Sequence, residues 1–299
     1  MRIAILMSTY NGEKYIRQQI ESVLAQQGDF TLDLWVRDDG SSDGTLQILQ
    51  AYQDAGKLRW YAGENLKPAH SFWDLLLHCE GYDYYAFADQ DDVWLPGKLQ
   101  AAVASIADKC GPALACANAE LVDADLKSLG RNVYLDPPPM DLETLSIAGG
   151  ILGCTMVVNR ALAQLVQSRP VPDVMVMHDF YIALVCRLAG GNLQFDMTPR
   201  MLYRQHGNNV VGASKNKLSA LADRLHTVTK RAKVSVCRQA QTLLKQYPDL
   251  GTQAQRKWLK RLANPTLANR AAIACSQKTH YPSMNKAITL RLAVFLGNR

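Results

Sequence analysis

Short, largely apolar runs alternate with amphipathic stretches over the first part of the chain. The apolar runs are Ile3–Met7, Leu32–Val36, Leu58–Ala62, Tyr84–Ala88 and Ala113–Ala117. Runs of this length are typical of buried strands. Between them, apolar residues recur at helical spacing, as at Ile16, Ile20 and Val23. This alternation predicts an α/β fold in which helices flank a mostly parallel central sheet, with ligands bound at the carboxyl ends of its strands.

A second set of elements follows a proline-rich break at Asp136–Met140. The pattern there predicts a strand at Thr155–Val158, a helix from Arg160 and another helix beginning near Asp179. From Asn216 to the end, the chain is helical in pattern and rich in Lys and Arg. The sequence therefore predicts a helical, cationic C-terminal extension.

Charge and cysteine content narrow the function classes. The formal net charge is +6, with acidic motifs in residues 1–150 and basic residues from Lys215 onward. Seven scattered cysteines without a C-x-x-C pair indicate reduced thiols and argue against a disulfide framework or a zinc site. The chain lacks G-x-G-x-x-G after its first strand and lacks G-K-[ST], which disfavours a dinucleotide fold and a P-loop.

We expect a cytoplasmic protein that is at most peripheral to the inner face of the plasma membrane. The N-terminal apolar run, Ile3–Met7, is too short for a secretory leader. No stretch approaches the roughly 20 apolar residues of a spanning helix.

Three carboxylates directly follow the fourth apolar run, in the segment Asp89-Gln90-Asp91-Asp92. Carboxylates gathered beside an apolar core repel one another and lose hydration, so they favour a hard divalent cation. A spacing of two along an extended segment would send Asp89 and Asp91 to the same side. The alternative is a solvated acidic loop in which Asp92 caps the helix after Pro96. The position of the cluster after an apolar strand favours a D-x-D metal site.

The turn from Asp38 to Thr45 also follows a predicted strand and has two interpretations. Asp, Gly and Ser are common turn residues, and Ser42 or Asp43 would serve as a helix cap. A carboxylate at a strand end can also accept the imide N–H of a uracil or thymine ring, which would select a pyrimidine nucleotide.

Two later segments carry further candidate residues. His178-Asp179 opens a predicted helix, where Asp179 is either an N-cap or an ionised general base for an acceptor hydroxyl. The segment Tyr203–Asn209 is either a polar loop or a phosphate-binding element. In the second case His206 would contact the metal or the diphosphate, and the Arg204 guanidinium would contact phosphate.

Taken in order, these blocks resemble family 2 glycosyltransferases of the GT-A type, which have a Rossmann-like sheet. The resemblance spans roughly residues 1–212 and rests on the segments Ser8–Gly12, Asp38–Thr45, Asp89–Pro96, His178-Asp179 and Tyr203–Asn208. The DQDDVW and YRQHGNN forms are most similar to the bacterial rhamnosyltransferase branch. Residues 1–212 would then form the catalytic domain and residues 213–299 a basic helical region.

The resemblance implies a nucleotide-diphospho-sugar donor, a Mg or Mn ion and transfer with inversion. By position, Thr9, Tyr10, Asn11, Asp38 and Asp39 would contact the nucleotide. Asp89 and Asp91 would form the D-x-D pair, with Asp91 and His206 on the metal, and Asp179 would be the catalytic base. The Q-x-x-R-W motif of processive synthases is absent, so we expect addition of a single sugar.

The resemblance favours dTDP-rhamnose as donor and a lipid-linked glycan of a bacterial cell-surface polysaccharide as acceptor. The alternatives are a UDP-hexose or UDP-N-acetylhexosamine donor, and a non-catalytic sugar-nucleotide or polysaccharide-binding protein. The cationic C-terminal region would contact an anionic membrane or, alternatively, the catalytic domain or a second subunit in a homodimer. Nucleic-acid binding is disfavoured because no Phe, Tyr or Trp lies between Lys215 and Lys245.

Overall fold

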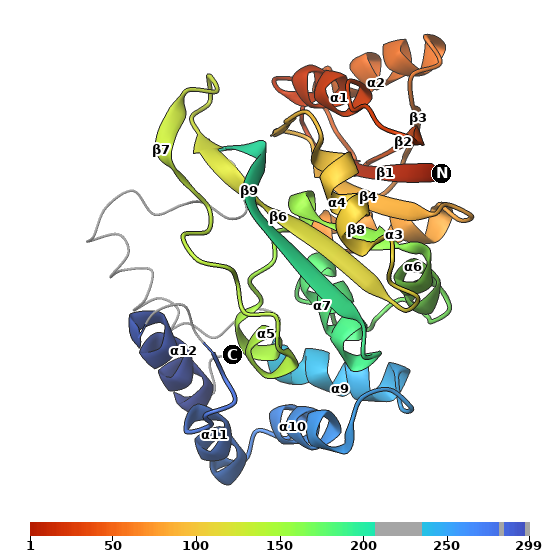
Figure 1. Cartoon of the computed structure of the whole chain (residues 1–299). Coiled ribbons are helices and arrows are strands. Elements are labelled where there is room, and N and C mark those ends of the chain that lie inside the picture. The colour runs from red at the N-terminus through yellow and green to blue at the C-terminus, as the bar shows by residue number, and fades with distance from the viewer. Residues whose placement is uncertain (207–234, 281–283, 297–299) are drawn as a thin grey trace.

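A computed structural model describes residues 1–206, 235–280 and 284–296 (Figure 1). At its centre is a sheet in the order β3-β2-β1-β4-β8-β6-β9-β5, with β7 paired to β6. The strands are β1 (Arg2–Thr9), β2 (Thr31–Asp38), β3 (Arg59–Ala62), β4 (Tyr84–Asp89), β5 (Val93–Trp94), β6 (Ala113–Val122), β7 (Ser128–Asn132), β8 (Val157–Asn159) and β9 (Asn192–Arg204). The predicted α/β architecture is confirmed.

The sheet is parallel in one half and mixed in the other. Strands β3, β2, β1 and β4 are mutually parallel, as the alternating pattern predicted. Strand β8 is antiparallel to β4 and to β6, β9 is parallel to β6, and β5 is antiparallel to β9. The prediction of a mostly parallel sheet therefore holds only for the N-terminal half of the sheet.

The longest strand, β9, was not predicted from the sequence. Its thirteen residues include Pro199 and several charged side chains, and most of them are half-buried. Its register with β6 also shifts near Asn118. A strand with neither a continuous apolar run nor regular alternation gives a weak sequence signal.

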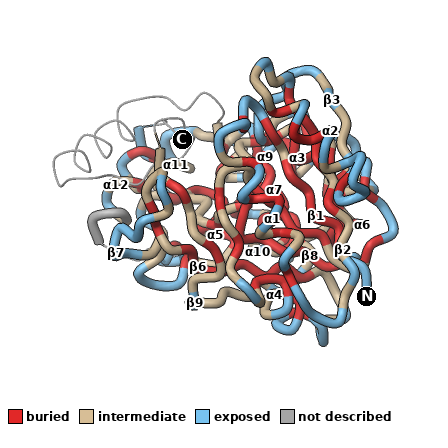
Figure 2. Tube along the Cα trace, turned by 90° about the horizontal axis from the view of Figure 1, so that it is seen from above, coloured by how far each residue is buried: buried red, intermediate tan, exposed pale blue. Residues whose placement is uncertain are grey.

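Helices cover both faces of the sheet. They are α1 (Ile16–Leu24), α2 (Thr45–Asp54), α3 (Lys67–His78), α4 (Lys98–Ile106), α5 (Leu142–Ala148), α6 (Arg160–Gln167), α7 (His178–Leu188), α9 (Val236–Gln246), α10 (Gln253–Ala263), α11 (Leu267–Ala274) and α12 (Met284–Leu296), with a short 3₁₀ helix η1 (Gly153–Thr155). Alternate residues of β1 point to opposite faces, as in any strand. Ile3, Ile5 and Met7 pack with α1, α2 and α4, whereas Ala4 and Leu6 pack with α3, α6 and α7. Figure 2 shows buried residues along β1 and α7 at the centre of the molecule.

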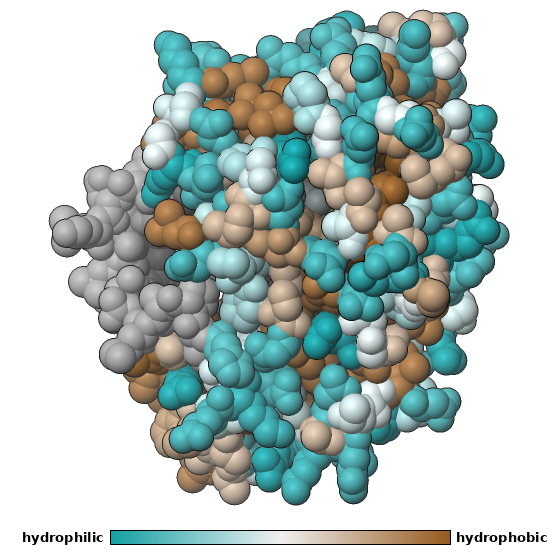
Figure 3. All heavy atoms as spheres, viewed as in Figure 1, coloured by the Kyte–Doolittle hydropathy of each residue, from teal (hydrophilic) through white to brown (hydrophobic). Residues whose placement is uncertain are grey.

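The C-terminal helices continue the second of these cores. The Trp258 indole on α10 donates a hydrogen bond to the Ser146 hydroxyl on α5 at 2.9 Å, and the Tyr181 hydroxyl on α7 donates to Gln246 on α9 at 2.7 Å. The predicted helical extension is confirmed for α9 to α12, whereas the proposed boundary at residues 212/213 lies outside the described residues. At the lower left of Figure 3, hydrophobic side chains reach the surface where α11 and α12 lie in Figure 1. Within the described ranges, no helix has both the length and the apolar character needed to cross a bilayer.

Candidate functional site

Strand register brings three polar turns to one edge of the sheet. In the parallel ladder Thr9 pairs with Asp38, and Ser8 pairs with Asp89. The turns that follow β1, β2 and β4 therefore leave the sheet at the same level. A cavity of about 300 Å³ opens there. Its lining includes six of the predicted site residues, Thr9, Tyr10, Asp39, Asp89, Asp91 and Asp179.

Two predicted nucleotide contacts instead hold the turns together. The Asp38 carboxylate is fully buried and accepts hydrogen bonds from the backbone amides of Gly40 and Ser41 at 3.0 and 2.8 Å. The Asn11 side-chain oxygen accepts from the Ser42 amide at 2.8 Å, which ties the turn after β1 to the turn after β2. Neither residue is among the described residues that line the cavity. Both side chains are therefore engaged within the turns, and their contact with the nucleotide stays a prediction.

Asp39 lies at the cavity wall and is already well supported. Its carboxylate pairs with the buried Arg37 guanidinium and accepts hydrogen bonds from the amides of Leu66 and Lys67 at 2.8 and 2.9 Å. These bonds fix the carboxylate at the end of β2 and join it to the start of α3. The fixed Asp39 carboxylate therefore lines the cavity as an acceptor for a hydrogen bond from a bound base or ribose.

Gln90 between the two acidic residues joins the turn after β4 to the end of β1. Its side chain accepts from the Tyr10 amide at 2.9 Å and donates to the Tyr10 carbonyl at 3.0 Å. A Cβ on Gly12 would lie only 2.2 Å from the Gln90 side-chain oxygen, so a larger residue at position 12 would displace the Gln90 side chain from Tyr10. Neither Gln90 nor Gly12 was predicted from the sequence as part of the site, because a middle position in D-x-D and a turn glycine carry no signal of a long-range contact.

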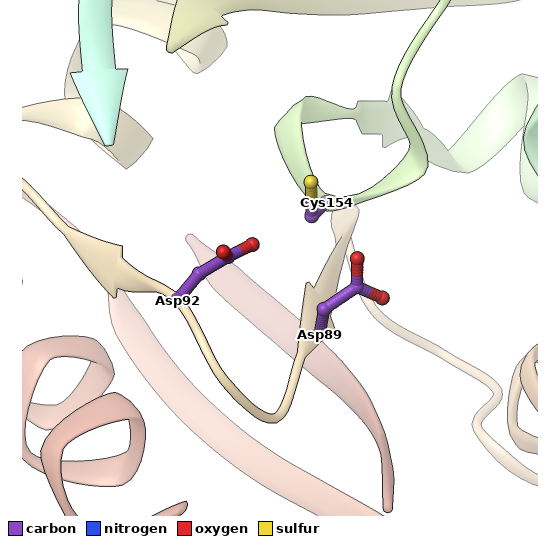
Figure 4. A group of neighbouring side chains, drawn as sticks. All are labelled: Asp89, Asp92 and Cys154. Carbon is purple, nitrogen blue, oxygen red and sulfur yellow. The ribbon is translucent and has the colours of Figure 1, made fainter. Parts of the chain in front are cut away.

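The acidic turn is electrostatically strained. The carboxylates of Asp89 and Asp92 both reach toward the Cys154 thiol (Figure 4), and single ligand atoms of these three residues lie within 4.8 Å of one another. Loss of hydration, and then repulsion by Asp91 and Asp179, raises the pKa of Asp89. Burial, and then repulsion by Asp91 and Asp89, raises the pKa of Asp92. A divalent cation would relieve this repulsion, so the carboxylate oxygens of the turn fit one.

Asp92 does not cap the following helix, because the N-cap of α4 is Gly97. Its carboxylate is buried beneath the turn and accepts from the Arg204 amide at 3.0 Å. Cys154 is neutral, since burial raises the pKa of its thiol. Mg²⁺ and Mn²⁺ prefer oxygen ligands, so Cys154 is a wall of the site and a poor ligand for either ion.

Asp91 lies against His206, although 115 positions separate them in the sequence. The His206 Nε2 is 2.8 Å from a carboxylate oxygen of Asp91. The imidazole also stacks on the Tyr15 ring, with centroids 5.0 Å apart. The two residues predicted as metal ligands are therefore neighbours. The remainder of the predicted Tyr203–Asn209 element, from residue 207, lies outside the described residues.

Arg204 supports this turn from inside the protein. Its side chain is 1% exposed, and its guanidinium donates to the carbonyls of Asp91 and Ala124 and to the side chain of Gln18. The same group lies over the Tyr15 ring at 4.4 Å from the centroid. Arg204 is not among the described residues that line the cavity. These bonds let Arg204 position the turn, and its contact with phosphate stays a prediction.

Asp179 faces the cavity from the first turn of α7. The N-cap of this helix is Met177, so the alternative that Asp179 is the cap does not hold. One carboxylate oxygen accepts from the Gly153 amide at 2.8 Å. Burial raises the pKa of Asp179 to about 6, against the opposing effect of hydrogen bonds from the backbone amides of Phe180 and Gly153. A carboxylate of that pKa is ionised at neutral pH and basic enough to accept a proton.

Gly153 and Cys154 reach the site because β8 reverses direction. In the antiparallel pairing Val157 lies opposite Ala86, so the residues just before β8 lie beside those just after β4. A Cβ on Gly153 would be 2.7 Å from His178 Nε2 and 3.2 Å from an Asp179 oxygen, so glycine is required there. The glycines at 149, 150 and 153 were the available sequence signal, but nothing in them specified a neighbour.

The sequence matches a known protein family and several curated proteins. The sequence model described as "Glycosyl transferase family 2" matches residues 4–163. A dTDP-rhamnosyl transferase, RfbG of Shigella flexneri, is 28% identical over 229 residues, which are 70% of this chain and 74% of that protein. The matching region spans only 31% and 37% of two further curated glycosyltransferases, from Nostoc and Bacillus subtilis.

Solved structures show the same fold at low sequence identity. The S. aureus TarS fragment in complex with UDP-GlcNAc has a TM-score of 0.53 and 16% identity, over 99% of this chain and 90% of that one. A mannosyltransferase from Pyrobaculum calidifontis, in complex with GDP-Man and Mn²⁺, has a TM-score of 0.53 and 18% identity, over 99% and 85%. The chain therefore belongs to glycosyl transferase family 2 and has the GT-A type of fold.

Proposed function

We propose that this glycosyltransferase is inverting and metal-dependent, and that it moves one sugar from a nucleotide-diphospho-sugar onto a hydroxyl of a glycan in bacterial cell-surface polysaccharide synthesis. The observation that carries the proposal is the convergence of Asp39, Asp89, Asp91 and Asp179 on one cavity. Four carboxylates from three separate parts of the chain suit a metal-bound diphosphate and a general base. They do not suit a neutral ligand.

Each end of the donor has a matching part of the cavity. Thr9, Tyr10 and Asp39 would bind the nucleoside, since the Tyr10 ring is half exposed and Asp39 is held as a hydrogen-bond acceptor. Asp91 and His206, with Asp89 beside them, would hold a Mg²⁺ or Mn²⁺ ion. When bound, the ion would offset the negative charge that develops on the departing diphosphate.

Asp179 would act on the acceptor. The acceptor hydroxyl oxygen forms a bond to the anomeric carbon as the bond from that carbon to the diphosphate oxygen breaks. The hydroxyl proton passes to the Asp179 carboxylate, and the nucleoside diphosphate leaves with the bonding electrons. A single displacement from the face opposite the leaving group inverts the anomeric centre. The Gly153 amide keeps the carboxylate aimed into the cavity.

We propose dTDP-rhamnose as the donor because the relative with the longest match described above is a dTDP-rhamnosyl transferase. The alternative is a UDP-sugar, as bound by the structurally similar TarS fragment. A non-catalytic sugar-nucleotide or polysaccharide-binding protein remains the alternative from another class, although all four carboxylates are in place.

A thermal-shift and product-release experiment tests the donor. A bound donor stabilises the folded chain by mass action, so the donor that binds best should raise the melting temperature most. With Mn²⁺ present, we expect dTDP-rhamnose to raise it more than UDP-glucose, UDP-galactose or UDP-N-acetylglucosamine, and dTDP to be released with a glycan acceptor. A larger increase with a UDP-sugar would contradict the rhamnose assignment. Stabilisation with no nucleotide release from any donor and acceptor would instead support the binding protein.

The acceptor is proposed to be lipid-linked, which would bring the protein to the inner face of the plasma membrane. Four cations on α10, Arg256, Lys257, Lys260 and Arg261, line one surface groove. On α12, Ile288, Leu292 and Phe295 are 50%, 47% and 41% exposed. Their spacing of four and three residues puts them on one helix face. Cations and exposed apolar side chains are the two features that bind anionic bilayers.

Vesicle co-sedimentation tests this contact with the full chain. We expect binding to phosphatidylcholine vesicles that contain phosphatidylglycerol, with binding weakening as salt increases. The double variant Lys257→Glu/Lys260→Glu should bind at least about 30-fold less, since each of the two basic residues lost contributes about 1 kcal/mol near an anionic surface and about 1.4 kcal/mol is tenfold. Lys57→Glu/Lys127→Glu makes the same charge change on other, exposed positions and should bind normally. Absence of binding at low salt would defeat the membrane contact, and a dimer dissociated by the α10 variant would favour a homodimer interface.

A further inference from the structure

His178 is buried beside Asp179, and its ring has unused hydrogen-bonding capacity. Its side chain is on the cavity wall, yet the residue is only 2% exposed. Neither Nδ1 nor Nε2 has a hydrogen-bond partner within the described part of the chain. A buried polar group without a partner destabilises the folded protein. Such a group in a substrate cavity suggests that the substrate supplies the partner.

Two aromatic rings fix the orientation of this imidazole. The centroid of the Phe72 ring on α3 lies 4.3 Å from that of His178, and that of the Phe87 ring on β4 lies 5.1 Å away. Packing between these rings prevents the imidazole from turning toward a partner elsewhere in the protein. The nitrogen atoms are therefore presented in fixed directions, as a specific ligand contact requires.

Gly153 packs closely against both His178 and Asp179. A Cβ at this position would lie 2.7 Å from Nε2 and 2.9 Å from Cε1 of His178, and 3.2 Å from an oxygen of Asp179. The two side chains therefore lie on either side of the Gly153 backbone, and all three residues line the same cavity. A substrate atom near the base would therefore also be near this imidazole.

The imidazole is neutral under ordinary conditions, because burial lowers the pKa of His178 to about 3. A neutral imidazole offers one N–H donor and one acceptor nitrogen. A hydroxyl group has the complementary pair, because it both accepts and donates. A phosphate, which only accepts, would satisfy one of the two nitrogens at most.

We propose that His178 binds a ring hydroxyl of the transferred sugar and so contributes to the choice of donor. This inference rests on the proposed glycosyl transfer. The acceptor hydroxyl must reach Asp179, which is 9% exposed, from the open side of the cavity. His178 is more deeply buried and packs between α3 and β4, so we place it against the transferred sugar of the donor.

The variant His178→Phe tests the contact, because it keeps an aromatic ring between Phe72 and Phe87 and removes both nitrogens. We expect kcat/KM for dTDP-rhamnose to fall about tenfold, the effect of losing one hydrogen bond in a buried site. The same comparison is made with dTDP-rhamnose analogues that each lack one ring hydroxyl. For the analogue that lacks the hydroxyl bound by His178, wild type and variant should be equally active. His178→Asn retains a donor and an acceptor and should recover part of the loss. His78→Phe, on an exposed histidine of α3, should leave activity unchanged.

A second measurement does not depend on turnover. In protein labelled with ¹⁵N-histidine, the ring signals of His178 should shift when dTDP-rhamnose is added and should not shift with dTDP alone. Two results would overturn the inference. One is that wild type and His178→Phe lose the same factor in kcat/KM for every deoxy analogue, and the other is that the His178 ring signals do not shift when the donor binds. If wild type transfers sugar from no nucleotide donor, the proposed function fails, which is a separate outcome. If His178→Phe does not fold, the ring signals of the wild type and the kinetics of His178→Asn test the inference instead.

Discussion

Replacing Asp179 by Asn is expected to lower kcat for sugar transfer by about 10²- to 10⁴-fold, the usual contribution of a general base. The single amide oxygen can keep the hydrogen bond from the Gly153 amide at 2.8 Å, although it loses the one from the Phe180 amide, and the melting temperature checks that the fold is retained. The amide cannot take the proton of the acceptor hydroxyl. Donor affinity, measured by calorimetry with Mn²⁺, should therefore change little while turnover falls.

The pH dependence gives an independent check of the same residue. Burial raises the pKa of Asp179 to about 6. Below that pH the carboxyl group is protonated and cannot act as base, so wild-type kcat/KM should fall about tenfold per pH unit as the pH decreases from about 6. Above it, the residue is ionised and the profile should be flat. The residual activity of Asp179→Asn should lack this acidic decline.

Asp173→Asn is the matched control, since Asp173 precedes α7 and pairs with Lys245 at the exposed surface. This variant should keep both the rate and the pH profile of the wild type. If Asp179→Asn transfers sugar at the wild-type rate, or keeps the acidic decline, another group is the base and the proposed mechanism is wrong.

Replacing Asp91 by Asn is expected to abolish most of the metal-dependent activity, by about 10²-fold or more, because an ion that stabilises the leaving group contributes several kcal/mol. The wild-type cluster is unfavourable without a cation, since Asp91 and Asp179 add to the burial that raises the pKa of Asp89. Removal of one negative charge should therefore leave the metal-free protein at least as stable as the wild type. Added Mn²⁺ should raise the melting temperature of wild type and should raise that of Asp91→Asn much less.

Asp125→Asn removes one carboxylate from an exposed turn and serves as the control for charge alone. It should respond to Mn²⁺ as the wild type does. Full Mn²⁺-dependent transfer by Asp91→Asn would remove this residue from the metal site. An equal thermal response in both proteins would show that the ion binds elsewhere.

Much of the site could be predicted because its residues follow predicted strands directly. Thr9, Asp39 and Asp89 stand at the ends of β1, β2 and β4, and parallel neighbours end at one edge of a sheet. Each of these strands is an apolar run in the sequence, so the position of the turn after it could be predicted. Asp179 was found by its place at a helix start, and the structure puts it in the same cavity.

Other assignments depended on contacts that no local pattern encodes. Arg204 is charged and lies in a polar segment, which suggested a phosphate contact, yet its guanidinium is buried against Asp91, Ala124 and Gln18. Asp38 resembles Asp39 in sequence, but only Asp39 lines the cavity, because successive residues at a strand end point in opposite directions.

The sequence by itself determined the strands of the parallel half, the order of the polar turns and the acidic character of the site, because hydrophobic periodicity and turn chemistry act over a few residues. Only the tertiary structure decided which side chains meet. The reversal of β8 beside β4 brings Gly153 and Cys154 to the acidic turn, and the path of β9 brings His206 to Asp91. Strand order, direction and register fix such contacts between distant residues, and they follow from the packing of the whole chain.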